Sequence, residues 1–203
     1  MLEDISRIDL KILELYTRDY SAVFSIRQVT SILKINYSNA FNRVKGMVKK
    51  GILIQKKTGK VNNISINILN LEAVKLISFI EETKNIKNTT IKLIIKEAIQ
   101  VDPFLCMGIF GSRASGKQSS SSDWDVFILT QKRKEIEKIM RKFPYSKNIQ
   151  LQAISQKEFE SSLLSSKDNL VKQLVKNKQI VYNPHPFYNM IQKWEMIKYA
   201  PSQ

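Results

Sequence analysis

The chain has 203 residues, with 33 lysines and arginines against 18 aspartates and glutamates, which gives a net charge of +15 at neutral pH. No stretch approaches the run of about 18 apolar residues that a membrane span needs, and a single cysteine excludes an internal disulfide framework. The acidic first residues are unlike a secretory signal peptide, so we expect a soluble, cytoplasmic protein. The charge favours an anionic partner. It does not distinguish among nucleic acid, nucleotide phosphates and an acidic protein.

The first seventy residues begin with two amphipathic helices. Isoleucine, leucine and tyrosine recur at helical spacing near the start, which predicts a first helix over about 3–19. Ser25 and Gln28 have the spacing of a capping box in front of a second apolar series. A second helix is therefore expected to begin there and to end near Lys34.

A third helix is expected over about 39–50, with Ser38 as its capping residue and Gly51 as the glycine after its last turn. Two short helices joined by a tight turn, the second polar on its outer face, are typical of a helix-turn-helix. The apolar stripe of the third helix is predicted to consist of Phe41, Val44 and Val48, with Met47 at its edge.

Two strand-like segments follow, residues 52–54 and the alternating residues 64–68. They predict a hairpin with Gly59 near its tip, in the position of a wing. The order of these elements resembles that of the winged helix-turn-helix DNA-binding domains, and the resemblance covers residues 1–70. It implies that the third helix is a recognition helix that meets base edges.

The charge of this domain is one-sided, because nine basic and no acidic residues lie between Ser25 and Lys60. Lysine and arginine in such a run can neutralise phosphates and release counterions. We therefore predict that the domain binds duplex DNA, and two alternatives stay open: a basic face that is only solvated, and a winged helix that mediates protein contacts. The residues expected to contact DNA are Asn39, Asn42, Arg43, Lys45, Lys49, Lys50, Lys56, Lys57 and Lys60.

A linker helix and connection over 71–87 join this domain to a second one over 88–203. In the second domain the apolar runs 104–110 and 126–129 predict buried strands. The terminal helix is amphipathic and is expected to pack on the core or in a homodimer rather than on a membrane. The whole chain is thus expected to be an α+β protein, with a winged helix-turn-helix followed by a mixed-sheet α/β domain.

The residues suited to chemistry lie between the two buried strands. Gly111 and Ser112 form a turn directly after the first strand, where backbone N–H groups and a hydroxyl can hold phosphate oxygens; Arg113 is expected to add a phosphate contact. Asp123 and Asp125 lie at the start of the second strand, and their carboxylates converge because residues i and i+2 of an extended segment point to one face. Two carboxylates suit Mg²⁺, which indicates metal-assisted nucleotidyl transfer.

Gly111-Ser112, ten intervening residues and then Asp123-x-Asp125 resemble the signature of the minimal nucleotidyltransferases in the DNA polymerase β-like superfamily. The resemblance covers about residues 88–185. It implies that the two aspartates are catalytic and bind Mg²⁺ or Mn²⁺, and that the glycine-serine turn binds a nucleoside triphosphate (NTP). Similar stand-alone domains are antitoxins that transfer a nucleoside monophosphate onto a toxin, so the implied acceptor is either a nucleic acid or a protein.

One position departs from that family, which carries a third carboxylate on a later strand. The corresponding strand here, 149–155, has glutamines instead. Strand register favours Gln152 as the replacement, with Gln150 as the second choice, and a neutral amide is no general base at pH 7. Two functions therefore stay open: a Mg²⁺-dependent nucleotidyltransferase with a DNA-binding winged helix, and a transcriptional regulator whose degenerate transferase domain senses a nucleotide or dimerises.

Overall fold

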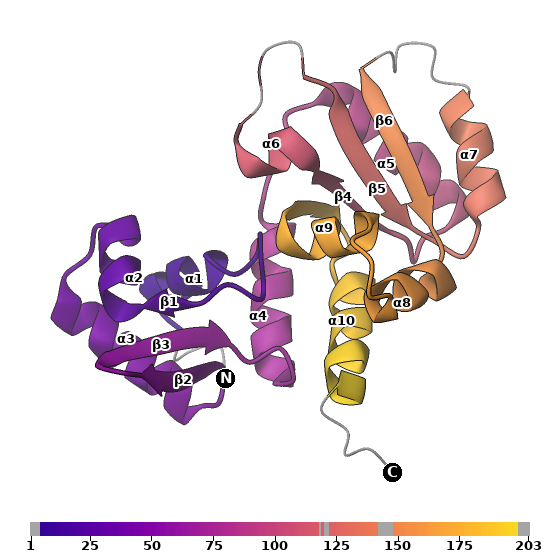
Figure 1. Cartoon of the computed structure of the whole chain (residues 1–203). Coiled ribbons are helices and arrows are strands. Elements are labelled where there is room, and N and C mark those ends of the chain that lie inside the picture. Colours follow the sequence, from indigo (N-terminus) through magenta and orange to yellow (C-terminus); the bar gives the residue numbers. More distant parts are fainter. Residues whose placement is uncertain (1–4, 118, 120–121, 142–147, 199–203) are drawn as a thin grey trace. The chain divides into compact units, whose positions relative to one another are not determined.

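The computed structural model describes residues 5–117, 119, 122–141 and 148–198, and the ribbon in Figure 1 follows the chain through them. The chain divides into two compact units, Met1–Ile80 and Glu81–Gln203. Both contain helices and a sheet, so the expected α+β content is confirmed. Within the described ranges, no helix combines the length and the apolar character that a membrane span requires.

The first unit alternates helices with short strands. Its sheet has the strand order β1-β3-β2 with antiparallel pairing throughout, and β2 and β3 form the hairpin that the sequence predicted around Gly59. The sequence did not predict β1, because a strand of two residues is too short to show alternation. The elements are α1 (Arg7–Glu14), β1 (Phe24–Ser25), α2 (Ile26–Leu33), α3 (Tyr37–Lys49), β2 (Leu53–Thr58), β3 (Val61–Ile66) and α4 (Leu71–Glu82), whose last two residues belong to the second unit.

Side-chain caps set where these helices begin. Ser25 and Gln28 form the predicted capping box at the start of α2. The predicted start of α3 was two residues late, because Asn36 rather than Ser38 is the cap: its side chain accepts the Ser38 N–H at 2.8 Å. The first helix is shorter than the predicted 3–19, and the first part of that range lies outside the described residues.

The end of α3 follows the sequence prediction. Gly51 has a φ of 70°, a left-handed conformation that side chains other than glycine rarely adopt. This turn lets the N–H of Ile52 reach back to the carbonyl of Met47 at 2.9 Å, which satisfies one of the last carbonyls of the helix. The chain then enters β2.

The buried face of α3 differs from the predicted stripe. Ala40, Val44 and Met47 are buried, whereas Phe41 is 39% exposed. The small Ala40 side chain fits against the core, and the larger Phe41 stacks on Tyr37 instead, with ring centroids 6.3 Å apart. The other core residues of this unit include Ile12, Leu13, Tyr16, Val29, Ile52 and Ile64.

The second unit is built on a mixed sheet with the strand order β6-β5-β4-β7. β5 and β6 are parallel, and the other two pairings are antiparallel. The elements are α5 (Thr89–Val101), β4 (Cys106–Phe110), α6 (Gly111–Ser115), β5 (Trp124–Leu129), α7 (Arg133–Arg141), β6 (Ile149–Ile154), α8 (Gln156–Leu164), α9 (Leu170–Lys176), β7 (Lys178–Tyr182) and α10 (His185–Lys198).

The two faces of this sheet have different coverings. On one face, Val126 and Ile128 of β5 belong to an apolar cluster with buried residues of α5 and α7. On the other face, Phe127 packs against Phe187 of α10, which in turn contacts Phe159 of α8. The predicted strands 104–110 and 126–129 are confirmed, with β4 beginning two residues later and β5 two residues earlier than the apolar runs. β5 is thereby held on both faces.

Candidate functional site

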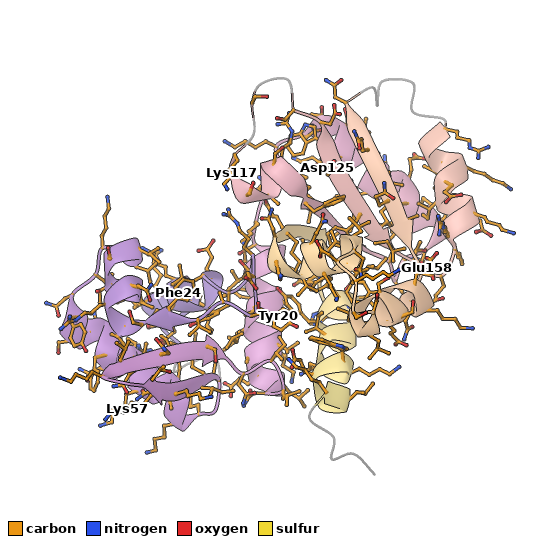
Figure 2. The ribbon with its side chains drawn as sticks, in the orientation of Figure 1. Tyr20, Phe24, Lys57, Lys117, Asp125 and Glu158 are labelled. Carbon is orange, nitrogen blue, oxygen red and sulfur yellow. The ribbon has the colours of Figure 1, made fainter. Side chains whose placement is uncertain are left out.

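The two aspartates lie where the chain enters β5, and Figure 2 labels Asp125. Alternation along the strand directs the side chains of Asp123 and Asp125 to one side and that of Trp124 to the other. Both aspartates are partly buried. Burial raises the pKa of the Asp125 carboxyl above its ordinary value, and the nearby Asp123 carboxylate raises it further. The sequence prediction that these two carboxylates converge agrees with this electrostatic coupling.

The Gly111 turn lies directly against Asp125. β4 pairs with β5 so that Phe110 is opposite Asp125, and Gly111 follows Phe110 with a φ of 70°. A Cβ atom at this position would collide with Oδ2 of Asp125. Gly111 is therefore required both by its backbone conformation and by the close approach of the carboxylate, and Ser112 is held next to the same site.

A third side chain meets the aspartates from β6. The amide nitrogen Nε2 of Gln150 donates a hydrogen bond to Oδ2 of Asp123 at 3.0 Å. In the parallel pairing, Gln150 is opposite Asp125, whereas Gln152 is opposite Phe127. The prediction that Gln152 occupies the third position is therefore wrong, because the register of β6 places Gln150 there and carries Gln152 two residues farther from the aspartates.

Arg113 supports the segment that leads into β5. Its Nε donates to the carbonyls of Ser122 and Asp123, each at 3.1 Å, and its guanidinium lies 4.3 Å from the centroid of the Trp124 ring. These contacts fix the backbone that carries the Asp123 carboxylate. A guanidinium has five N–H donors, which is more than these contacts use. A phosphate contact from Arg113 therefore stays a prediction.

Asn177, which was not predicted from the sequence, holds the Gly111 turn from the side of β7. Its Nδ2 donates to the carbonyl of Gly111 at 3.0 Å. Its Oδ1 is buried and has no hydrogen-bond partner among the described residues. No sequence motif marks this residue, because 66 positions separate it from Gly111 and only the folded sheet brings them together.

The donor set suits a metal ion that arrives with a nucleotide. Asp123 and Asp125 supply hard oxygen ligands, and no group of three His, Cys, Asp or Glu residues that could hold a metal occurs in the described part of the chain. Mg²⁺ is commonly held by one or two carboxylates, with substrate phosphates and water as its other ligands. The two aspartates fit that role, and the neutral Gln150 amide adds no charge to them.

A basic surface covers α3 and the β2–β3 hairpin in the first unit, where Figure 2 labels Lys57. Asn39, Asn42, Lys45 and Lys49 of α3 are exposed, and so are Lys50 and the hairpin residues Lys56, Lys57 and Lys60. The surface is thus accessible at eight of the nine positions that were predicted to contact DNA.

Arg43 is the ninth position and has a structural partner. Its guanidinium forms an ion pair with Asp9 of α1, with Nε 2.8 Å from Oδ1. Burial acts to raise the pKa of Asp9, but hydrogen bonds from Arg43 and Ser6 outweigh it and lower that pKa below the ordinary value. The prediction that Arg43 contacts DNA did not take this pairing into account. The sequence gives no sign of it, because 34 residues separate Arg43 from Asp9.

A hollow beside the basic surface was not predicted from the sequence either. This cavity of about 370 Å³ lies between the start of α2, the start of α3 and the hairpin. Tyr37, which stacks on Phe41, lines it together with Arg27, Lys60 and Val61. The sequence feature that could have indicated this cavity is the pair Tyr37 and Phe41, because residues four positions apart share one face of a helix.

Comparison with known proteins adds one finding. The family model "Polymerase beta, Nucleotidyltransferase" matches residues 92–186, a range that includes Gly111, Asp123, Asp125 and Gln150. No curated protein and no solved structure matches the chain. The match supports the DNA polymerase β-like superfamily for this part of the chain, and nucleotidyl transfer as its general chemistry.

Proposed function

We propose that the second unit transfers a nucleoside monophosphate from an NTP to an acceptor hydroxyl. The observation that carries this proposal is the approach of the Gly111 turn to Asp125, whose pKa is raised by burial and by the nearby Asp123 carboxylate. The family match over residues 92–186 supports the same reaction class. The acceptor is either a nucleic acid or a partner protein, such as a toxin.

Each residue has a defined part in this proposal. Asp123 and Asp125 would hold Mg²⁺ or Mn²⁺, which when bound would neutralise charge on the phosphates. The backbone of Gly111 and the Ser112 hydroxyl would bind phosphate oxygens. Asn177 holds the carbonyl of Gly111 and so keeps the turn against the carboxylates.

The reaction forms one bond and breaks one. The acceptor oxygen attacks the α-phosphorus, the bond from that phosphorus to the β-phosphate bridge breaks, and pyrophosphate leaves. The proton of the acceptor hydroxyl passes to solvent, since the third position holds Gln150, an amide that accepts no proton at neutral pH. We therefore expect transfer to be slow.

We further propose that the first unit is a winged helix that binds duplex DNA, with α3 as recognition helix and the β2–β3 hairpin as wing. Eight exposed amide and lysine side chains on these elements support it. Lysines there would neutralise phosphates, and Asn39 and Asn42 would meet base edges. The DNA-binding unit would bring the transferase to a nucleic-acid acceptor or to its own operator.

Label transfer tests the enzymatic proposal. The purified full chain is incubated with each α-labelled NTP and Mg²⁺ or Mn²⁺ in a nuclease-inhibited lysate of its source organism. We expect a labelled RNA, DNA or protein band that the Asp123→Asn, Asp125→Asn variant does not produce. Label that survives in this variant would disprove the role of the aspartates, and no label with any NTP would disprove the transferase.

Gln150 supports a second function, a DNA-binding transcriptional regulator whose transferase fold binds a nucleotide without transferring it. The two aspartates would still hold a metal-bound nucleotide, but the side chain that meets them from β6 is an amide rather than a third acid. This function predicts duplex binding that weakens steeply with salt and changes when NTP and Mg²⁺ are added. Duplex binding that is insensitive to nucleotide would argue against it.

A further inference from the structure

A cavity in the second unit lies at the end of the sheet away from the aspartates. It has a volume of about 580 Å³ and opens beside Leu129 and Thr130, at the end of the β5 ladder. Asp125 is five residues earlier, so at the rise of an extended chain the two places are about 16 Å apart. Figure 2 shows Asp125 toward one end of the sheet, and Glu158, in the first turn of α8, toward the other.

The wall of this cavity is held rigidly by hydrogen bonds. Thr130 and Asp102 are both buried, and the Thr130 hydroxyl donates to Oδ2 of Asp102 at 2.6 Å. The other oxygen of Asp102 accepts the N–H of Phe104 at 3.1 Å. On the far side, Nδ2 of Asn183 donates to the carbonyl of Leu105 at 3.2 Å. The loop before β4 is thus fixed in place.

The ring of Phe104 stands out from this fixed loop. It lines the cavity and is 81% exposed, the largest exposed fraction among the large apolar side chains of the described residues. The ring lies at the cavity mouth, on a loop that is hydrogen-bonded through Asp102 and Asn183. Pro186 and Met190 of α10 continue the apolar lining. This half of the cavity suits a flat ring, which can stack on phenylalanine.

The polar lining is made of amides and one cation. Gln131, Gln156 and Asn189 supply carboxamides. Nε2 of Gln131 donates to Oε1 of Gln156 at 3.2 Å, and Nε2 of Gln156 donates to Oε1 of Glu160 at 2.9 Å. Each of these two amides has a second N–H and a second carbonyl lone pair that can meet the edge of a nucleobase. Lys132 supplies an ammonium, one of whose three N–H groups bonds the carbonyl of Val101 at 2.7 Å. The one acid of the lining, Asp102, has both oxygens engaged by the chain.

We propose that this cavity is a second nucleotide site, which binds a nucleoside monophosphate with its base on Phe104 and its phosphate on Lys132. Its volume is within the range of about 300–1,000 Å³ that is usual for small-molecule sites. The site involves neither the aspartates nor the Gly111 turn, so it does not depend on the transferase reaction. Its occupant would act as a regulatory ligand.

Equilibrium dialysis of the full chain tests the site. The probes are radiolabelled AMP, CMP, GMP and UMP in the presence of EDTA, so that no divalent metal draws them to the aspartates. We expect saturable binding of at least one of them, retained in the Asp123→Asn, Asp125→Asn variant. Phe104→Ala should weaken this binding about tenfold or more, as for the loss of one stacked base. The matched control Leu164→Ala removes another exposed apolar side chain, 64% exposed and not part of the lining, and should leave binding unchanged.

A second binding experiment tests whether Lys132 binds the phosphate. The wild-type chain should bind the monophosphate more tightly than the unphosphorylated nucleoside, and Lys132→Gln should abolish that preference while Lys134→Gln preserves it. Absence of saturable binding by all four nucleotides would overturn the proposal. So would binding that Phe104→Ala leaves intact and the double aspartate variant removes.

Discussion

Gln150 donates a hydrogen bond from its side-chain amide to the carboxylate of Asp123, across the parallel strands β5 and β6, at 3.0 Å. In the proposed transferase, this is the position at which a third acid would complete the site. The Gln150 amide donates and the Asp123 carboxylate accepts, so Asp123 has a partner on β6 that adds no third negative charge. For the proposed transferase, we therefore expect a metal-bound nucleotide to bind and proton removal from the acceptor to be slow.

Restoring an acid at this position should raise the rate of transfer. Gln150→Asp places a carboxylate beside Asp123 that can accept the acceptor's proton, and general-base catalysis contributes about 10²-fold or more; we expect at least about a tenfold gain. Gln152→Asp is the matched control, because it adds the same group opposite Phe127. Initial rates of label transfer measure both variants. Equal rates for the two would show that proton removal is not limiting.

Gly111→Ala should abolish transfer, because its Cβ would displace the Asp125 carboxylate. Gly116→Ala is the matched control: Gly116 has a φ of 72°, close to the 70° of Gly111, but no atom lies within 4 Å of its Cβ position. Both variants carry the backbone cost of a left-handed residue, about 1–2 kcal/mol, which urea unfolding measures. Only the Gly111 variant should lose label transfer. Loss in both would trace the defect to backbone strain.

The ion pair between Asp9 and Arg43 should stabilise the first unit. Asp9→Asn leaves the guanidinium without its carboxylate. The Arg43 side chain is 34% exposed, so we expect a cost of about 1.5–3 kcal/mol, as for hydrogen bonds to charged groups, rather than that of a fully buried pair. The pKa of Asp9 is lowered in the folded state, so its stabilisation is present above the ordinary value of 3.8 and is lost as pH falls through the lower folded value. Urea unfolding should show a difference between variant and wild type at pH 7 that shrinks as the pH falls below 3.8. Equal stability at pH 7 would contradict the assignment.

The wing lysines should set the salt dependence of duplex binding. The variant with Lys56→Gln, Lys57→Gln and Lys60→Gln should reduce the slope of log affinity against log salt by up to about 0.9 for each phosphate that a lysine no longer neutralises. Lys92→Gln with Lys96→Gln removes exposed charge from α5 and serves as the control. Fluorescence anisotropy with a labelled duplex at several salt concentrations gives the slopes. Equal slopes in all three proteins would exclude the hairpin from the DNA interface.

The exposed aromatic pair on α3 should act differently from the lysines. Phe41→Ala removes an apolar contact and no charge, so it should weaken duplex binding several-fold without changing the salt slope. Because an aromatic ring can contact the methyl group of thymine, the loss should be largest on A·T-rich duplexes and should disappear when uracil replaces thymine. Anisotropy with matched thymine and uracil duplexes measures this. Unchanged affinity for every duplex would place Phe41 outside the interface.

The sequence alone determined the features that depend on near neighbours. The capping box of Ser25 and Gln28, the glycine stop at Gly51 and the two apolar strands around the Gly111 turn follow from short spacings, because helix caps, turns and alternation are local properties of the chain. The convergence of Asp123 and Asp125 is local in the same sense, since two residues in one strand need no other element to share a face.

The tertiary structure decided which distant residues meet. The register of β6 against β5 brings Gln150 rather than Gln152 to Asp123, and a slip of one pair along a strand changes every contact while leaving the sequence pattern intact. Long-range pairing also engages Arg43 with Asp9 and Asn177 with Gly111. The cavity beside Phe104 is assembled from four separate segments of the chain. These relations depend on how the elements pack, so no local spacing in the sequence could have specified them.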